Sequence, residues 1–275
     1  MALTSLRREH ITNRAFLRTH AVIRVETRSV TPSRTLRTLS RIQSGHAILS
    51  YDFMNDSQVR AVELLAQEYG YGWGSLHAHK VADLATSIFD RLELLGLLPG
   101  LTLDDRQTLV ALGYSHDIGA SPRARQETSL LPNWAKAFAE TDRHGVMAFH
   151  AIRARIDTAS SERPISTLNP EERSLLLYCL LWHASSAEYV LDTEPLLDRR
   201  KALLLAGILR VADGLDGQHR LRVREIEIHK ASAWLRLLVR SLEPATEEVA
   251  QTQKKSDMLS HALSLRIFVQ EVVGA

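Results

Sequence analysis

Five segments of this chain repeat apolar residues with the period of an α-helix, and each carries a histidine or an aspartate on its apolar side. His77, for example, shares one side of its predicted helix with Val81, Leu84, Ile88 and Leu92. Polar groups on a buried face are costly unless they find partners there. The pattern therefore favours a fold in which several helices surround a shared polar interior.

Four further segments place their polar residues in the same way, four to eight positions from apolar neighbours. Taken singly, such a residue is ordinarily a satisfied core residue. Taken together, four inward histidines and two inward aspartates are most simply satisfied by one metal site, and neutral imidazole and carboxylate suit manganese, iron, zinc or magnesium. The sequence thus predicts a divalent metal site of one or two ions, with these ligands: His77, His116, Asp117, His144, His183 and Asp213.

The predicted fold class is mainly α, with a small α/β appendage. We expect an irregular basic leader over residues 1–50, a helical domain over 51–217 and the appendage over 218–275. The expected helices begin at Ser57, Ser75, Asp104, Arg143, Asn169 and Pro195, and another covers Thr246–His261. Strands are expected over Ala21–Val30, Val223–His229, Trp234–Val239 and Leu263–Val273. The polar segment 119–142 is expected to be a long connection, with at most a short helix around Trp134–Phe138.

The leader carries an uneven share of the charge. Residues 1–42 contain nine arginines and two glutamates, a net charge of +7, so the rest carries −5 of the overall +2. An arginine-rich, acid-poor segment is compatible with a transit peptide, a nucleic-acid arm or a solvated extension. The balanced charge of the whole chain gives no strong signal for nucleic acid as a partner.

Composition excludes several other classes of protein. One cysteine, Cys179, rules out a disulfide framework and a thiolate-rich zinc site. No apolar run approaches the ~20 residues of a transmembrane helix, and the N-terminus lacks the apolar stretch of a secretory signal. We therefore expect a cytoplasmic protein with a small-molecule ligand and no membrane partner, and a homodimer stays open.

The polar residues stand in a recognisable order. The sequence reads His-Ala-His-Lys from His77, Ser-His-Asp-Ile-Gly to Gly119, Trp-His at His183, and Ala-Asp-Gly-Leu-Asp to Asp216. This order resembles the HD family of metal-dependent phosphohydrolases. The most similar subgroup is the C-terminal domain of the exopolyphosphatase/guanosine pentaphosphate phosphohydrolase family, over roughly residues 55–270. The resemblance implies an HD-type helical bundle.

The resemblance also implies an activity, which is hydrolysis of a phosphoester or phosphoanhydride in a nucleotide-like or polyphosphate-like substrate by metal-activated water. His77, His116, Asp117 and Asp213 would hold a first ion. His144 and His183 would complete a second, with Asp117 bridging. Lys80, Arg123 or Arg125 would neutralise charge on the phosphoryl group. Asp216 is expected to orient a ligand, His79 is a weaker substrate-contact candidate, and Asp83 and His219 are expected to lie outside the site.

Three departures limit what carries over. Only about 50 residues precede the matching region, and we expect no actin-like phosphatase domain there, so the chemistry of such a domain is not transferred. The segment between Asp117 and His144 is longer than usual, and Ala120 stands where a lysine is common. Two alternatives stay open on the same fold: a non-catalytic sensor of a nucleotide or phosphorylated ligand, and a di-iron oxygenase.

Overall fold

The structure is a computed structural model that describes residues 55–70, 76–128, 143–158, 164–184 and 198–273. The chain divides into two units, Met1–Leu49 and Ser50–Ala275, and the described residues belong to the second. The predicted leader with its strand Ala21–Val30, the cap Ser75, the short helix Trp134–Phe138 and the helix start at Pro195 lie outside the described residues.

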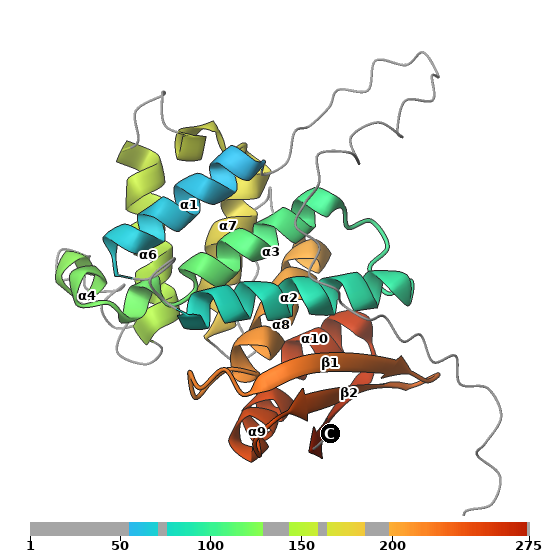
Figure 1. The fold of residues 1–275 in the computed structure, drawn as a ribbon. Coiled ribbons are helices and arrows are strands. Elements are labelled where there is room, and N and C mark those ends of the chain that lie inside the picture. Colours follow the sequence, from blue (N-terminus) through green and yellow to red (C-terminus); the bar gives the residue numbers. More distant parts are fainter. Residues whose placement is uncertain (1–54, 71–75, 129–142, 159–163, 185–197, 274–275) are drawn as a thin grey trace, which may run out of the picture. The chain divides into compact units, whose positions relative to one another are not determined.

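The second unit is mostly helical, with a small three-stranded sheet near its C-terminus, as the sequence predicts (Figure 1). Its helical part comprises α1 (Asp56–Glu68), α2 (Leu76–Leu94), α3 (Leu103–Ser115), η1 (Ile118–Ala120), α4 (Pro122–Thr128), α6 (Arg143–Thr158), η2 (Pro164–Thr167), α7 (Pro170–His183) and α8 (Arg199–Gly214). Within the described ranges, none of the helices combines the length and the apolar character that crossing a membrane requires.

The helix starts follow from local capping chemistry. Asn169 caps α7 as predicted, accepting from the backbone N–H of Glu172, whose side chain accepts from Asn169 in return. The start of α3 differs from the prediction, because Thr102 and Asp105 form the capping box and Asp104 lies inside the first turn. The prediction that 119–142 is a connection with at most one short helix, around Trp134–Phe138, is wrong at its start, because Pro122–Thr128 forms α4. Ser121 allows it to form by accepting a hydrogen bond from the backbone N–H of Ala124.

The core lies among α2, α3, α6, α7 and α8. Phe89, Leu109, Ile152, Leu176 and Trp182 are among its buried side chains, one from each of α2, α3 and α6 and two from α7. Gly113 allows a close contact between two helices of this core. A Cβ on Gly113 would lie 2.6 Å from the Cα of Ala82, so α3 packs directly on the backbone of α2. This close contact fixes two of the helix ends that carry the polar residues.

The C-terminal part contains β1 (Val223–Lys230), β2 (Trp234–Ser241), α9 (Thr246–Lys255), α10 (Asp257–Leu263) and β3 (Arg266–Val273). β1 pairs antiparallel with β2, and β2 pairs in parallel with β3. The parallel pairing requires a crossover, which α9 and α10 supply while packing on α8. The prediction of one helix over Thr246–His261 is wrong, because the helix breaks at the buried Ser256, whose hydroxyl donates to the carbonyl of Gln253.

Candidate metal centre

The six predicted ligands lie at the ends of five helices. His77 is the second residue of α2, and His144 is the second residue of α6. The other four lie at C-terminal ends: His116 caps α3, Asp117 follows it, His183 ends α7, and Asp213 is next to last in α8. The structure brings all six together, in two groups whose potential ligand atoms lie within 4.8 Å of one another.

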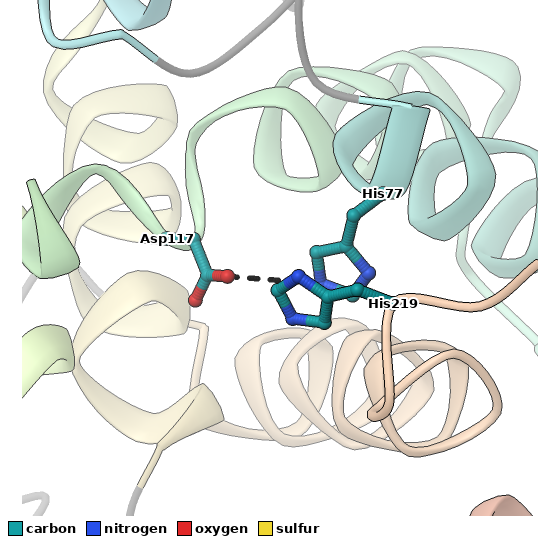
Figure 2. Close-up of side chains that lie close together, drawn as sticks. All are labelled: His77, Asp117 and His219. Carbon is teal, nitrogen blue, oxygen red and sulfur yellow. Dashed lines mark ion pairs between the residues drawn. The ribbon is translucent and has the colours of Figure 1, made fainter.

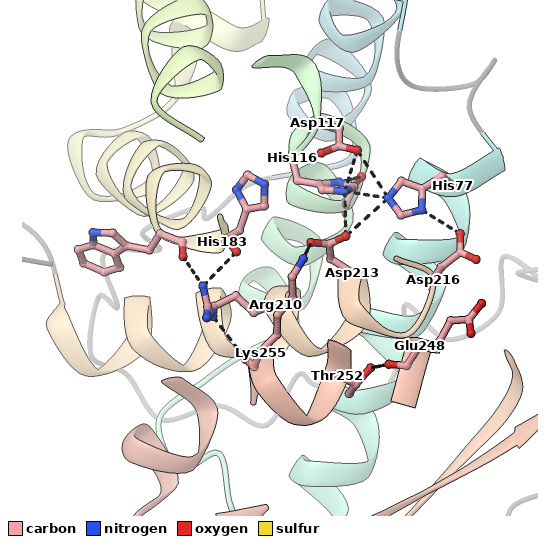
Figure 3. Close-up of polar contacts among 12 residues, drawn as sticks. His77, His116, Asp117, His183, Arg210, Asp213, Asp216, Glu248, Thr252 and Lys255 are labelled. Atoms are coloured by element: carbon pink, nitrogen blue, oxygen red, sulfur yellow. Dashed lines mark hydrogen bonds and ion pairs between the residues drawn. The ribbon is translucent and has the colours of Figure 1, made fainter. Parts of the chain in front are cut away.

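The first group contains His77, His116 and Asp213, all buried. The Nε2 atoms of the two histidines are 3.2 Å apart, and Oδ1 of Asp213 lies 3.7 Å from one and 3.8 Å from the other. Oδ2 of Asp117 lies at similar distances, 3.6 and 3.7 Å, from the same nitrogens. Two imidazole nitrogens and two carboxylates from three helices therefore face one small volume (Figure 3).

The second group contains Asp117, His144 and His183. Asp117 is thus close to both groups, as expected for a bridging carboxylate. His183 is fully buried, and its Nε2 has no hydrogen-bond partner in the described part of the chain. A buried polar nitrogen without a partner costs about 1–3 kcal/mol, so a ligand for this atom would remove a real penalty.

Hydrogen bonds on the far side of each ring set the tautomers. Nδ1 of His116 lies 2.9 Å from the carbonyl of Gly113, and Nδ1 of His183 lies 2.6 Å from the carbonyl of Leu180. A carbonyl only accepts, so both Nδ1 atoms carry the proton and both Nε2 atoms present lone pairs. Nδ1 of His77 donates in the same way to the buried carboxylate of Asp216, at 2.8 Å. The Nε2 lone pairs of His77 and His116 therefore converge, an arrangement that suits a cation.

Asp216 occupies the place that the sequence predicts for it. Its Oδ2 holds His77, and its Oδ1 accepts a 2.7 Å hydrogen bond from the backbone N–H of Leu221. Its side chain is 1% exposed, so both bonds are shielded from water. One carboxylate therefore orients a candidate ligand and fixes the turn after α8.

The prediction that His219 lies outside the site is wrong. Its ring stacks on that of His77, with centroids 3.8 Å apart and planes at 7°, and it forms a third potential ligand group with His77 and Asp117 (Figure 2). The backbone of His219 has φ +54°, a conformation that costs a non-glycine residue about 1 kcal/mol or more. Helical periodicity missed it because it lies in an irregular turn, although it follows Asp216 by only three residues.

For His183, Asp117 and Asp213 the electrostatics favour the protonation states that metal ligands need. Burial lowers the pKa of His77, but Asp216, Asp117 and Asp213 outweigh it and the pKa is raised overall. Burial lowers the pKa of His183 well below its usual value, aided by His144 and His116, so this ring is neutral. Burial raises the pKa of Asp117, but His116 and other histidines outweigh it and the pKa is lowered overall. Burial likewise opposes ionisation of Asp213, yet Lys255 and the histidines hold its pKa well below the usual range. Both carboxylates are therefore ionised at neutral pH.

Lys255 and Arg210 contact residues of the site and the helix ends that carry them (Figure 3). Helical spacing does not assign either residue to the site. The ammonium of Lys255 is bonded to Oδ2 of Asp213. The buried guanidinium of Arg210 donates to the carbonyls of Trp182, His183 and Lys255, at 3.2 to 3.3 Å, and to Asp257 at 2.9 Å. Arg210 thereby joins the C-terminal ends of α7 and α9.

The predicted phosphate-binding residues are placed differently from one another. Lys80 is half-buried, and burial lowers its pKa despite the nearby carboxylates of Asp216 and Asp83. Arg123 donates to Glu127 and to the backbone carbonyl of Glu68, and its guanidinium lies 5.0 Å from the ring centroid of Tyr69. These contacts belong to a surface network between α1 and α4, and they do not bring Arg123 to the ligand groups.

The other predicted residues are Arg125, Asp83 and His79. The side chain of Arg125 lies outside the described residues. Asp83 is exposed, as predicted. His79 meets the ring of Tyr114 edge-on at 5.1 Å, away from the inward stripe of α2.

No protein-family model matches this chain, and no curated protein matches it.

Proposed function

We propose that this chain is a metal-dependent phosphohydrolase of the HD type, which cleaves a phosphoester or phosphoanhydride. One observation carries the proposal: Asp117 belongs to one group of ligand atoms and lies close to the other, and the Nε2 atoms of His77, His116 and His183 all present lone pairs to these groups. The order of these residues in the chain, with the His-Asp pair between a first histidine and a late aspartate, supports the same family.

The residues present fit a divalent metal. His77, His116, Asp117 and Asp213 would hold one ion, and Asp117, His144 and His183 would hold a second. Imidazole nitrogen and carboxylate oxygen are ligands for manganese, iron, zinc and magnesium alike. The unpartnered Nε2 of His183 is the clearest sign, since a buried nitrogen has no other described use there. Bound divalent ions supply Lewis acidity, which favours hydroxide over water at neutral pH and neutralises charge on phosphoryl oxygens.

The side chains of this protein have separate tasks in the proposed reaction. Asp117 would take part in both ligand groups, because its Oδ2 lies near Nε2 of His77 and His116 and the residue also groups with His144 and His183. Asp216 holds the ring of His77 with Nε2 unprotonated. Lys80, within electrostatic reach of Asp216, remains our candidate for neutralising charge on a phosphorylated small molecule.

The test combines metal analysis with turnover. Protein purified without chelator is expected to contain a divalent metal. It should also release phosphate from at least one member of a panel of phosphate esters, nucleotides and polyphosphate, with added manganese or magnesium. Asp117→Ala should abolish turnover and lower bound metal while the fold survives. His79→Ala is the matched control, because its ring faces Tyr114, and it should keep its metal with at most a modest loss of activity.

Other outcomes would point elsewhere. A protein without turnover that a nucleotide stabilises against heat would be a sensor, since preferential binding to the folded state raises its stability. Bound iron with oxygen uptake would indicate an oxygenase. Full activity in Asp117→Ala would refute the site assignment.

A further inference from the structure

The last residue of α9, Lys255, places its ammonium group next to a residue of the candidate metal centre. Lys255 is bonded to Oδ2 of Asp213, while Oδ1 of the same carboxylate faces Nε2 of His77 and His116 (Figure 3). The two oxygens of Asp213 are therefore divided between a metal-facing side and a lysine-facing side. Lys255 is therefore adjacent to the ligand groups through Asp213, and its side chain is 29% exposed.

The position of Lys255 is fixed by packing of its backbone. Arg210, whose side chain is 6% exposed, donates to the carbonyl of Lys255 and to that of His183. The same guanidinium thus sets the end of α9 relative to a metal-ligand candidate. Close packing adds to this, because a Cβ on Gly214 would lie 2.8 Å from the Cα of Thr252. The helix that carries Lys255 therefore touches the backbone of α8 immediately after Asp213.

The charge of the site shows what Lys255 can recognise. Asp117, Asp213 and the buried Asp216 contribute three negative charges, and Lys255 contributes one positive charge. One divalent ion makes this set neutral, and two ions make it positive by two units. A site with two ions therefore attracts a terminal phosphate, which carries close to two negative charges at neutral pH, more strongly than a singly charged diester. An ammonium has three donors, so Lys255 can keep its bond to Asp213 and still donate to a phosphoryl oxygen.

We propose that Lys255 is a second phosphate-binding residue of this centre beside Lys80, and that the substrate class is molecules with a terminal phosphate. The inference rests on the proposed function, and it assigns to the C-terminal appendage a part in substrate recognition. Lys254, the preceding residue, is exposed and makes none of the contacts described for Lys255, so it provides a matched control for charge alone.

The experiment measures binding of inorganic phosphate by calorimetry, to the manganese-loaded and the metal-free protein. Lys255→Gln is expected to weaken phosphate binding at least tenfold, and Lys254→Gln to change it less than twofold. Manganese affinity should stay the same or rise in Lys255→Gln, because Asp213 loses a competing cation. Lys255→Arg should restore much of the phosphate affinity. If the enzyme turns over, Lys255→Gln should raise KM for a terminal phosphate far more than for a diester.

The outcomes separate this inference from the proposed function. Phosphate affinity in Lys255→Gln equal to that of the wild type would overturn the inference, and so would an equal loss in Lys254→Gln or a wild type that binds no phosphate. Absence of manganese binding or of any turnover would instead overturn the proposed function, whatever the ratio of phosphate affinities. A Lys255→Gln variant that unfolds is judged on Lys255→Arg, which must bind phosphate more tightly than Lys255→Met in the same assay.

Discussion

Gly119 offers a sharp test of how the fold positions the candidate centre. It lies in η1, two residues after Asp117, and a Cβ added there would lie 1.8 Å from the carbonyl oxygen of His144 and 2.7 Å from the backbone nitrogen of Ala148. Ordinary contact begins near 3.4 Å, so Gly119→Ala requires α6 to move by more than 1 Å. The obstacle is backbone, which cannot rotate away. Overpacking usually costs about 1–3 kcal/mol, and we expect about 3 kcal/mol here.

The displacement should also reach the metal site. His144 is on the first turn of α6, so a shift of this helix separates it from Asp117 and His183. Urea unfolding in chelator measures the stability, and manganese titration measures the binding. Gly119→Ala should lose the weaker class of manganese sites, which we assign to the second ligand group.

The control is Gly207→Ala, which places a Cβ 2.8 Å from the Cα of Leu259, at the contact between α8 and α10. It should lose about 1–2 kcal/mol and keep its manganese. The reasoning is refuted if Gly119→Ala costs under about 0.5 kcal/mol, the level of an ordinary surface substitution. Equal loss of manganese in both variants would show that binding follows global stability and not the position of His144.

Two further predictions concern the metal and the turn after α8. Chelation should lower the melting temperature, and manganese at 100 times its dissociation constant should restore about 2.7 kcal/mol of stability; calorimetry that shows no shift contradicts a metal site. The free energy of unfolding of His219→Gly should exceed that of His219→Ala by at least about 1 kcal/mol, because only glycine is free of strain at φ +54°. Both variants should bind manganese equally, and less tightly than the wild type, if the ring contributes to the site.

The elements of the fold that the sequence could predict are those with strong local signals. Asn169 followed by Pro170 and two glutamates specifies a helix start through its own capping chemistry, and α7 begins and ends where expected. The break between α9 and α10 has no such signal. Serine occurs both at helix caps and inside helices, and at Ser256 only the packing of α10 on α8 decides between the two. Thr102 and Asp104 are equally good caps in the sequence, and the reciprocal bond with Asp105 selects Thr102.

The candidate site could likewise be predicted only where its residues belong to regular helices. Periodicity finds residues that face inward, and it found His77, His183 and Asp213, but it does not say which helix ends meet. It also has no meaning in irregular segments, so His219 was missed. Long side chains are the hardest case, because Lys255 belongs to a helix that reaches Asp213 only through the approach permitted by Gly214.

The hydrogen bonds of Asp216 predict what its replacement by asparagine should do. Its two oxygens accept from two N–H groups, Nδ1 of His77 and the backbone of Leu221. Asparagine has one accepting oxygen and one donating NH₂, so Asp216→Asn can satisfy only one of them. If the oxygen keeps Leu221, the NH₂ faces Nδ1 and forces the proton of His77 onto Nε2, where it blocks the lone pair directed at the metal site.

If the amide turns round instead, Nδ1 keeps its acceptor, but the NH₂ opposes the N–H of Leu221 and disturbs the turn that carries His219. Both orientations weaken the site, so Asp216→Asn should lower manganese affinity by about 10- to 100-fold. Asp83→Asn makes the same chemical change at an exposed position of α2 and should leave the affinity unchanged. Nitrogen NMR of His77 in the metal-free protein distinguishes the two orientations by the protonated nitrogen. Wild-type manganese affinity in Asp216→Asn would show that His77 does not bind metal through Nε2.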